Sequence, residues 1–163
     1  MPEMAISNTS PIQYLYQLGL MHLLPHFYQQ VAIPPAVAEE LSTGRSLGVE
    51  LPDLASLAWL EVRRSDQMQP LPLATMLGIG ERQVLALALE MANSLVILDD
   101  GRARRIGRLL GLKMTGTVGI LARGMREGLI PQLLPMLERL ESLGFRLSTE
   151  VKAVALRLVG EGF

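Results

Sequence analysis

Short apolar runs recur along the chain and alternate with longer segments in which apolar residues have helical spacing. The runs lie at residues 4–7, 31–33, 59–62 and 95–98, with a weaker one at 113–115. Runs of this length between turn-forming or charged residues are typical of buried strands, and strands that alternate with helices form a parallel sheet covered on both faces. We therefore predict an α/β fold, a three-layer α/β/α sandwich around a central parallel sheet of four to five strands.

Apolar spacing and helix-terminating residues place the helices. After Gly80, for example, Val84, Leu85 and Ala88 share one face, and Gly111 closes the helix that precedes it. The predicted helices cover residues 10–18, 36–41, 102–110, 117–127, 131–143 and 149–159, and a further helix begins after Gly80. Loops are expected at residues 42–52 and 65–72, where Gly, Ser or Pro accompanies weak periodicity.

The composition favours one soluble domain. Its 163 residues are 49% hydrophobic, which is enough for one sizeable core. No apolar run approaches the roughly 20 residues that span a membrane, so we expect no membrane partner. The absence of cysteine excludes disulfides and thiolate metal sites, and it suits a reducing cytoplasm, where we expect this protein to be located.

Charge is distributed unevenly along the chain. Residues 1–100 contain four Lys/Arg and eleven Asp/Glu, a net charge of −7, whereas residues 101–163 contain eleven and five, a net charge of +6. An acidic cation-binding cluster beside a basic phosphate-binding surface would produce this division. Ordinary solvated helix faces with unequal charge would produce it too.

Polar residues directly follow two of the predicted strands. Asn8 follows the first strand, and Asp99 and Asp100 follow the fourth. In an open parallel sheet, ligands bind beyond the carboxyl ends of the strands, so these residues are the first candidates for chemistry. Each also fits a purely structural interpretation, as the cap or first-turn residue of the next helix.

Two further acids lie on the apolar faces of predicted helices. Glu40 follows Val37 by three positions, and Glu81 precedes Val84 by three. A carboxylate directed toward a core is costly unless it is paired or bound to a metal. The four positions at Asn8, Glu40, Glu81 and the two aspartates are thus expected to meet at one end of the sheet, where several oxygens would suit Mg²⁺ or Mn²⁺.

Five segments together resemble a known family. They are ISNTSP at residues 6–11, IPPAVAEEL at 33–41, GERQVLALA at 80–88, VILDD at 96–100 and TGTVG at 115–119. In order and spacing they resemble a prokaryotic branch of the PIN-domain-like superfamily, related to the VapC-type toxin ribonucleases. The resemblance implies a PIN-like domain at residues 1–147, with a C-terminal helix at residues 148–163 packed on it.

The resemblance also implies roles for individual residues. Glu40 matches the second acid of the family, Glu81 the third, and Asp100, with Asp99 adjacent, the fourth. These acids would hold Mg²⁺ or Mn²⁺, and the attacking group would be a metal-activated water. Asn8 completes the expected catalytic set.

Asn8 stands where the family usually has an aspartate, in an Asp-Thr-Ser motif. Asparagine offers a neutral carbonyl oxygen, which ligates a cation but holds it less strongly than a carboxylate. Thr9 and Ser10 complete the motif. Their hydroxyls suit the orientation of Asn8 or of a metal-bound water, and they suit the capping of the next helix equally well.

RNA is the partner that the resemblance implies. Four arginines after the aspartates are candidates for phosphate contacts: Arg102, Arg104, Arg105 and Arg108. Their alternative interpretation is a solvated helix face. A toxin role would add a small antitoxin protein as partner, and relatives of this type often form homodimers.

Three functions are therefore open. The first is a divalent-metal-dependent endoribonuclease, which would be the toxin of a toxin–antitoxin pair. The second is a PIN-like nucleic-acid-binding or regulatory protein that lost turnover because its first acid is Asn8. The third is an oligomeric interaction module whose acids bind no ligand.

Overall fold

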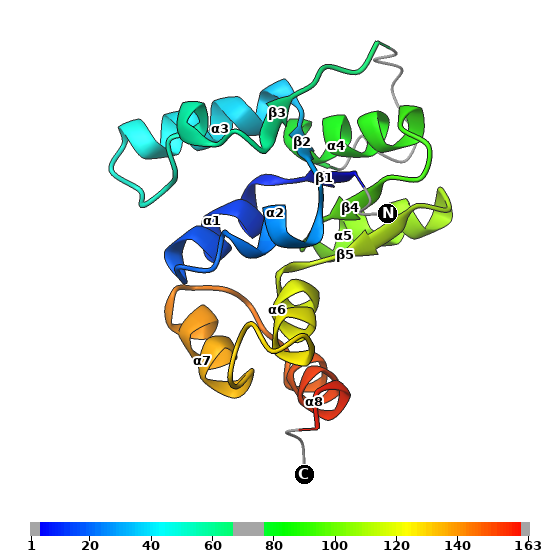
Figure 1. The fold of residues 1–163 in the computed structure, drawn as a ribbon. Helices are drawn as coiled ribbons and strands as arrows, with labels where there is room; N and C mark the ends of the chain where they lie inside the picture. The colour runs from blue at the N-terminus through cyan, green and yellow to red at the C-terminus, as the bar shows by residue number, and fades with distance from the viewer. Residues whose placement is uncertain (1–3, 67–76, 161–163) are drawn as a thin grey trace.

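The computed structural model describes residues 4–66 and 77–160, and its centre is a five-stranded parallel sheet (Figure 1). The strands are β1 (Ala5–Ser7), β2 (Val31–Ile33), β3 (Leu60–Val62), β4 (Leu95–Ile97) and β5 (Lys113–Thr115). They lie in the order β3-β2-β1-β4-β5, and every neighbouring pair is parallel. The predicted strands are confirmed to within one residue at each end.

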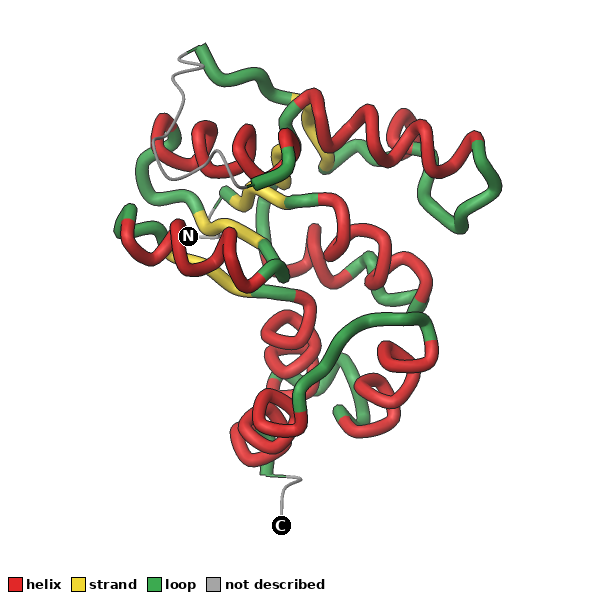
Figure 2. Tube along the Cα trace, turned by 180° about the vertical axis from the view of Figure 1, so that it is seen from behind, coloured by secondary structure: helices red, strands yellow, loops and turns green. Residues whose placement is uncertain are grey.

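Helices lie on both sides of this sheet, which confirms the predicted three-layer α/β/α sandwich (Figures 1 and 2). They are α1 (Thr9–Gln17), α2 (Leu23–Phe27), α3 (Pro35–Ser46), α4 (Ile79–Glu90), α5 (Gly101–Leu109), α6 (Thr117–Arg126), α7 (Leu134–Ser142) and α8 (Thr149–Leu158). A short 3₁₀ turn, η1 (Leu54–Ser56), follows α3. Side chains of the strands and inward helix faces, such as Ile6, Ile97 and Leu85, form a fully buried core between the layers.

The strand order creates a switch point between β1 and β4. From β1 the chain continues to β2 and β3 on one side, and from β4 it continues to β5 on the other. Connections that leave two adjacent parallel strands in opposite directions open a crevice at the carboxyl ends of those strands. Asn8 follows β1 and Asp99 follows β4, so both residues lie at this crevice.

Two helical boundaries differ from the predictions by three residues or more, and one helix is additional. The helix α3 continues to Ser46, through the first half of the loop predicted at residues 42–52, because Leu51 folds back against it. A Cβ on Gly44 would lie 2.7 Å from Leu51 Cδ1, which shows how closely the two segments pack. The helix α7 begins at Leu134 instead of residue 131, and α2, with only five residues, was not predicted. Most of the loop predicted at residues 65–72 lies outside the described residues.

The three C-terminal helices lie at the opposite end of the molecule from α3 and α4, and α6 packs against α1 (Figure 1). The rings of Tyr14 in α1 and Phe145 after α7 meet edge to face, with centroids 5.1 Å apart. The helix α8 packs against α6 and buries Ala155 and Leu156. The division of the chain after residue 147 stays a prediction. In the part of the chain that the structure describes, no helix is long and apolar enough to cross a membrane.

Candidate functional site

Asn8 occupies the crevice between β1 and β4. Its backbone N–H donates to the carbonyl of Ile97 in β4 at 3.0 Å, which joins the ends of the two strands. Asn8 is the N-cap residue of α1 by position, yet its side chain makes no capping hydrogen bond. The interpretation of Asn8 as the N-cap of α1 is therefore confirmed by position only, and its side-chain amide, at 9% exposure, is free to face a ligand.

The first turn of α4 lies against both Asn8 and Glu40. A Cβ built on Gly80 would be 2.9 Å from Glu40 Oε1 and 3.5 Å from Asn8 Oδ1. Only a residue without a side chain permits this approach. Three segments far apart in the sequence, namely the end of β1, α3 and α4, therefore bring their polar groups to one point.

Gln83 fixes the two acid-bearing helices to each other. The backbone N–H of Ala36, in the first turn of α3, donates to Gln83 Oε1 in α4 at 2.9 Å. The cap residue of α3 is Pro34, whose side chain has no acceptor, so the amide of Gln83 satisfies a donor that the helix leaves open. Sequence reasoning missed Gln83. A helix that starts with Pro-Pro, without a Ser, Thr, Asp or Asn cap, was the available signal.

Glu81 lies in the first turn of α4, between two other acids. Burial raises its pKa above the ordinary value of 4.5, and the charge of Asp100 raises it further. A backbone hydrogen bond at Gly78 lowers the pKa, and Glu40 raises it. Glu40, Glu81 and Asp100 thus form a cluster of like charge that favours a bound proton or a cation.

Glu40 corrects one expectation. It is exposed, so it is not a carboxylate directed into the core. Its position on the apolar side of α3 instead places it at the rim of the crevice, where it accepts a hydrogen bond from the hydroxyl of Thr9. Water reaches Glu40, so the cost of burial gives no reason to infer a metal there. Its contact with Thr9 and its approach to Gly80 are the informative observations.

Asp99 is held by three hydrogen bonds from the first turns of two helices, α1 and α6. The Ser10 hydroxyl donates to Oδ2 at 2.7 Å, and Thr117 donates from its backbone to Oδ1 at 2.8 Å and from its hydroxyl to Oδ2 at 2.7 Å. Thr117 is fully buried at the start of α6. Asp99 therefore links the segment after β4 to the starts of α1 and α6. Thr117 was missed from the sequence, where the TGTVG segment was the only signal.

Asp100 caps α5, as its structural interpretation predicted. Its Oδ2 accepts the backbone N–H of Ala103 at 2.9 Å, and the residue is exposed. Among the described residues, Oδ1 has no hydrogen-bond donor. The two adjacent aspartates thus differ: Asp99 has both oxygens engaged by protein, whereas Asp100 keeps one oxygen for a ligand.

The sequence of the whole described chain matches a known protein family. The model of the family DUF3368, described as a PIN domain, matches residues 4–161. The chain belongs to this PIN domain family. No curated protein matches the chain. PIN domains have a nuclease-type fold, generally use divalent metals and commonly bind nucleic acids, so the crevice between β1 and β4 is the place to test for both.

The acidic side chains of this PIN domain are of the chemical type that binds divalent cations. Carboxylate and amide oxygens are the ligands of hard ions. Burial is the main cause of the raised pKa of Glu81, and a cation would offset the further contribution of the charges of Asp100 and Glu40. Within residues 4–66 and 77–160, no three His, Cys, Asp or Glu side chains are close enough together to hold one metal ion. The described acids therefore offer at most two carboxylates to any one divalent ion, and waters would have to complete its coordination.

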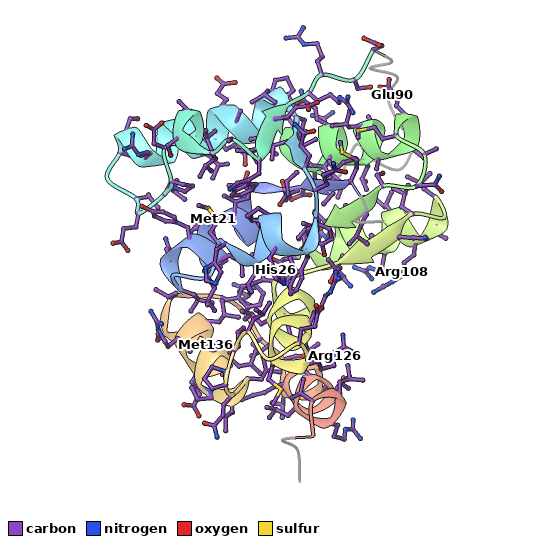
Figure 3. All side chains as sticks on the ribbon, viewed as in Figure 1. Met21, His26, Glu90, Arg108, Arg126 and Met136 are labelled. Atoms are coloured by element: carbon purple, nitrogen blue, oxygen red, sulfur yellow. The ribbon has the colours of Figure 1, made fainter. Side chains whose placement is uncertain are left out.

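The basic surface of the PIN domain begins at α5. Between residues 101 and 126 the chain has seven Lys/Arg and no Asp/Glu. Three of the four candidate arginines are exposed on α5: Arg102, Arg105 and Arg108. In Figure 3, Arg108 from α5 and Arg126 from α6 both lie in the right-hand half of the view.

Arg104, the fourth candidate, is half-buried and turned toward the crevice. Its Nη1 donates to the carbonyl of Leu98 at 2.8 Å and would lie 3.2 Å from a Cβ on Gly116. Burial lowers the pKa of Arg104, the charge of Arg108 lowers it further, and Asp99 raises it. Arg104 therefore belongs to the surroundings of Asp99, and only the three exposed arginines present a free face.

Proposed function

We propose that this PIN domain is a divalent-metal-dependent endoribonuclease. The observation that supports this best is the convergence at Gly80, where Asn8 and Glu40 meet the first turn of α4. Glu81 in that turn lies close enough to Asp100 and Glu40 for both charges to raise its pKa. These four residues come from separate segments of the chain. No single structural role explains why their side-chain oxygens lie together at the switch point of the sheet.

Each residue has a distinct proposed role. Glu40, Glu81 and Asp100 would share the binding of Mg²⁺ or Mn²⁺, one or two of them as direct ligands and the rest through bound waters, and Asn8 would add a neutral carbonyl oxygen. Such an ion supplies an activated water as nucleophile and stabilises the negative charge that develops on the phosphate. The Thr9 hydroxyl orients the Glu40 carboxylate toward the crevice.

Asp99 takes a positioning role in this proposal. Its two oxygens accept hydrogen bonds from Ser10 and Thr117, so it orders the loops that carry Asn8 and Asp100. Ser10 acts in the same way, through Asp99. Asp99 thus stays in the catalytic region without being a direct ligand.

RNA is the proposed substrate, bound by the exposed arginines of α5. A row of guanidinium groups beside an acidic crevice attracts a phosphate backbone and directs one phosphodiester toward the acids. Three further parts of the proposal come from the likeness to VapC-type toxins. They are a toxin role, a small antitoxin partner and a homodimeric state.

The second candidate function is a PIN-like nucleic-acid-binding or regulatory protein with weak or no turnover. Asn8 favours it, because a neutral oxygen in place of a carboxylate weakens the hold on a cation. The two candidates share the fold and the nucleic-acid surface. They predict different effects of a negative charge at residue 8 on RNA cleavage.

Cleavage of single-stranded RNA in Mg²⁺ or Mn²⁺ tests both candidates. The proteins are the wild type, Asn8→Asp, Asp100→Asn and the control Asp53→Asn. Asparagine caps helices as well as aspartate does, so Asp100→Asn keeps the cap on Ala103 and removes only the charge. Asp53 caps η1 through the N–H of Ala55 and is not part of the acid cluster, so it matches the change in charge and cap.

The nuclease proposal expects cleavage by the wild type and by Asp53→Asn, and a loss of about 10²-fold or more in Asp100→Asn. Cleavage by Asn8→Asp alone would establish the second candidate. Undiminished cleavage by Asp100→Asn would refute the assignment of the site.

A further inference from the structure

The only two histidines of the chain lie one helical turn apart at α2. His22 is the N-cap residue of this short helix, and His26, which Figure 3 labels, lies in its last turn. The backbone N–H of His26 donates to the carbonyl of His22 at 3.3 Å, so the chain between them completes one α-helical turn. Neither histidine belongs to the acid cluster at the crevice between β1 and β4.

The buried side of α2 determines where the two imidazoles point. Leu23, Leu24 and Phe27 are buried in the core, whereas His22 and His26 are both exposed. At about 100° per residue, the two histidines lie within about 40° of each other around the helix. They therefore share the solvent-facing side of α2, where residues four positions apart have Cβ atoms roughly 5–6 Å apart.

Local sequence and packing hold the backbone of α2 in place. Pro25 lies in the first turn, where its fixed φ suits a helix and its missing N–H leaves no hydrogen bond unmade. The guanidinium of Arg123 in α6 lies 4.2 Å from the centre of the Phe27 ring. The rings of His26 and Phe27 meet edge to face, with centroids 5.5 Å apart. Both imidazoles can thus turn toward one ion by side-chain rotation alone.

Two imidazoles on one helical turn are a chelating pair for a transition-metal ion. Imidazole nitrogen suits Zn²⁺, Ni²⁺ and Cu²⁺, whereas Mg²⁺ and Mn²⁺ prefer the oxygen ligands that the acid crevice offers. The chain has no cysteine, so these two histidines are its only imidazole or thiolate ligands. The pair at α2 and the acid crevice therefore select different classes of metal ion.

We propose that His22 and His26 bind a divalent transition-metal ion, at a site separate from the Mg²⁺ or Mn²⁺ site of the proposed nuclease. Among the described residues, no group of three His, Cys, Asp or Glu side chains could hold a metal ion. Two protein ligands therefore hold this ion, and waters complete its coordination. A closed structural zinc site has four protein ligands, so the site at α2 binds its ion reversibly.

The bound ion stabilises the turn that leads from α1 into β2, because α2 lies between these two elements. An ion that binds the folded chain more tightly than the unfolded chain raises stability as its concentration exceeds the dissociation constant. In the unfolded chain the two imidazoles are not held on one helical face, so their affinity is lower. Added Ni²⁺ should therefore raise the Tm of the wild type but not that of His22→Gln. This effect does not depend on whether the protein cleaves RNA.

Isothermal titration calorimetry with Ni²⁺, on protein without a histidine tag, tests the proposal directly. The wild type should bind one Ni²⁺ at this site. His22→Gln and His26→Gln should each bind at least about tenfold more weakly, because even the loss of groups behind metal ligands has an effect of this size. The wild type should bind Cu²⁺ more tightly than Ni²⁺, and Ni²⁺ more tightly than Co²⁺, as expected for nitrogen ligands.

Two control variants separate the histidine pair from other sources of affinity. The double variant His26→Gln/Gln29→His keeps two histidines but moves one beyond the helical turn, to an exposed position. It should bind Ni²⁺ as weakly as the single variants, with an unchanged far-ultraviolet circular dichroism spectrum. Asp100→Asn, which alters the acid crevice, should bind Ni²⁺ like the wild type. A wild type that binds Ni²⁺ no more tightly than the double variant would overturn the proposal, as would loss of binding in Asp100→Asn.

Discussion

Gly80 controls how closely the acids of α3 approach α4. A methyl group at this position would lie 2.9 Å from Glu40 Oε1 and 3.4 Å from Val37 Cγ2. The first contact involves the flexible end of a side chain, so the helix can accept alanine if the Glu40 carboxylate moves away. The consequence at the residue scale is a change in the site with little change in the fold.

We therefore predict that Gly80→Ala weakens Mn²⁺ binding by about tenfold or more, the usual effect of disturbing groups around a metal site. The measurement is isothermal titration calorimetry. Gly101→Ala is the matched control, because it lies beside Asp100 at the start of a helix and a Cβ there meets nothing within 4 Å. Equal Mn²⁺ affinities for the two variants would contradict the close approach at Gly80.

A second prediction at the residue scale concerns the effect of Glu81 on the stability of the metal-free protein. Its raised pKa means that the folded state holds the proton more tightly than the unfolded state does. Stability is therefore lost as the pH rises from about the ordinary value of 4.5 through the raised pKa, and the loss is complete above it. Glu81→Gln removes this loss, so we expect a higher Tm at pH 7 in EDTA and a smaller difference near pH 4.

Thermal unfolding of Glu81→Gln and of the exposed neighbour variant Glu39→Gln at both pH values provides the check. Glu39 faces solvent beside Glu40, so its replacement should leave the Tm nearly unchanged at either pH. A Glu81→Gln effect that is the same at both pH values would show that ionisation of Glu81 is not the cause.

The convergence of these acids was expected from the sequence, but their supports were not. Asn8, Asp99 and Asp100 follow strand ends, and strand ends in a parallel sheet share one edge. Thr117 and Gln83 follow no such rule. Their partners are 18 and 47 residues away, so the contacts depend on helix orientations that a single sequence does not encode locally.

At the scale of elements, Gln83 determines how α3 sits relative to α4. Its amide oxygen accepts the N–H of Ala36, so its loss leaves a helix donor without a partner and frees the end that leads to Glu40. We predict that Gln83→Ala lowers the free energy of unfolding by about 1 kcal/mol and also weakens Mn²⁺ binding. Gln83→Glu, which keeps an acceptor, should recover the stability.

Urea unfolding and Mn²⁺ titration measure the two effects of Gln83 separately. Arg82→Ala is the control, since Arg82 is the exposed neighbour of Gln83 on α4. A Gln83→Ala protein that loses stability yet binds Mn²⁺ as tightly as the wild type would confine Gln83 to a structural role.

Element boundaries show which signals the sequence carries. The strands were predicted closely because each is a short β-branched or apolar run between turn residues. The tail of α3 was taken for a loop because residues 42–46 have no apolar periodicity, and contact with Leu51 replaces that signal. The helix α2 escaped prediction because five residues that include Pro25 are too short to show a period.

At the scale of the whole molecule, the unequal charge of the two halves predicts how RNA binding depends on salt. The basic stretch at residues 101–126 has no acid, and on α5 it exposes Arg102, Arg105 and Arg108. Each arginine that contacts a phosphate releases condensed counterions when RNA binds, so the slope of log K against log salt counts such contacts. Replacing one of them should reduce the slope measured with single-stranded RNA by about 0.7.

We predict this reduction for Arg105→Ala and Arg108→Ala, measured by fluorescence anisotropy with single-stranded RNA over a KCl series in the Asp100→Asn background, where cleavage does not interfere. Arg45→Ala, an exposed arginine at the end of α3 in the acidic half, should leave the slope unchanged. Arg104→Ala should behave differently, because its guanidinium is bound to Leu98 and lies near Asp99. The loss of Arg104 should lower the Tm and leave the salt slope nearly unchanged. Equal slopes for all four variants would show that α5 is not the RNA-binding surface.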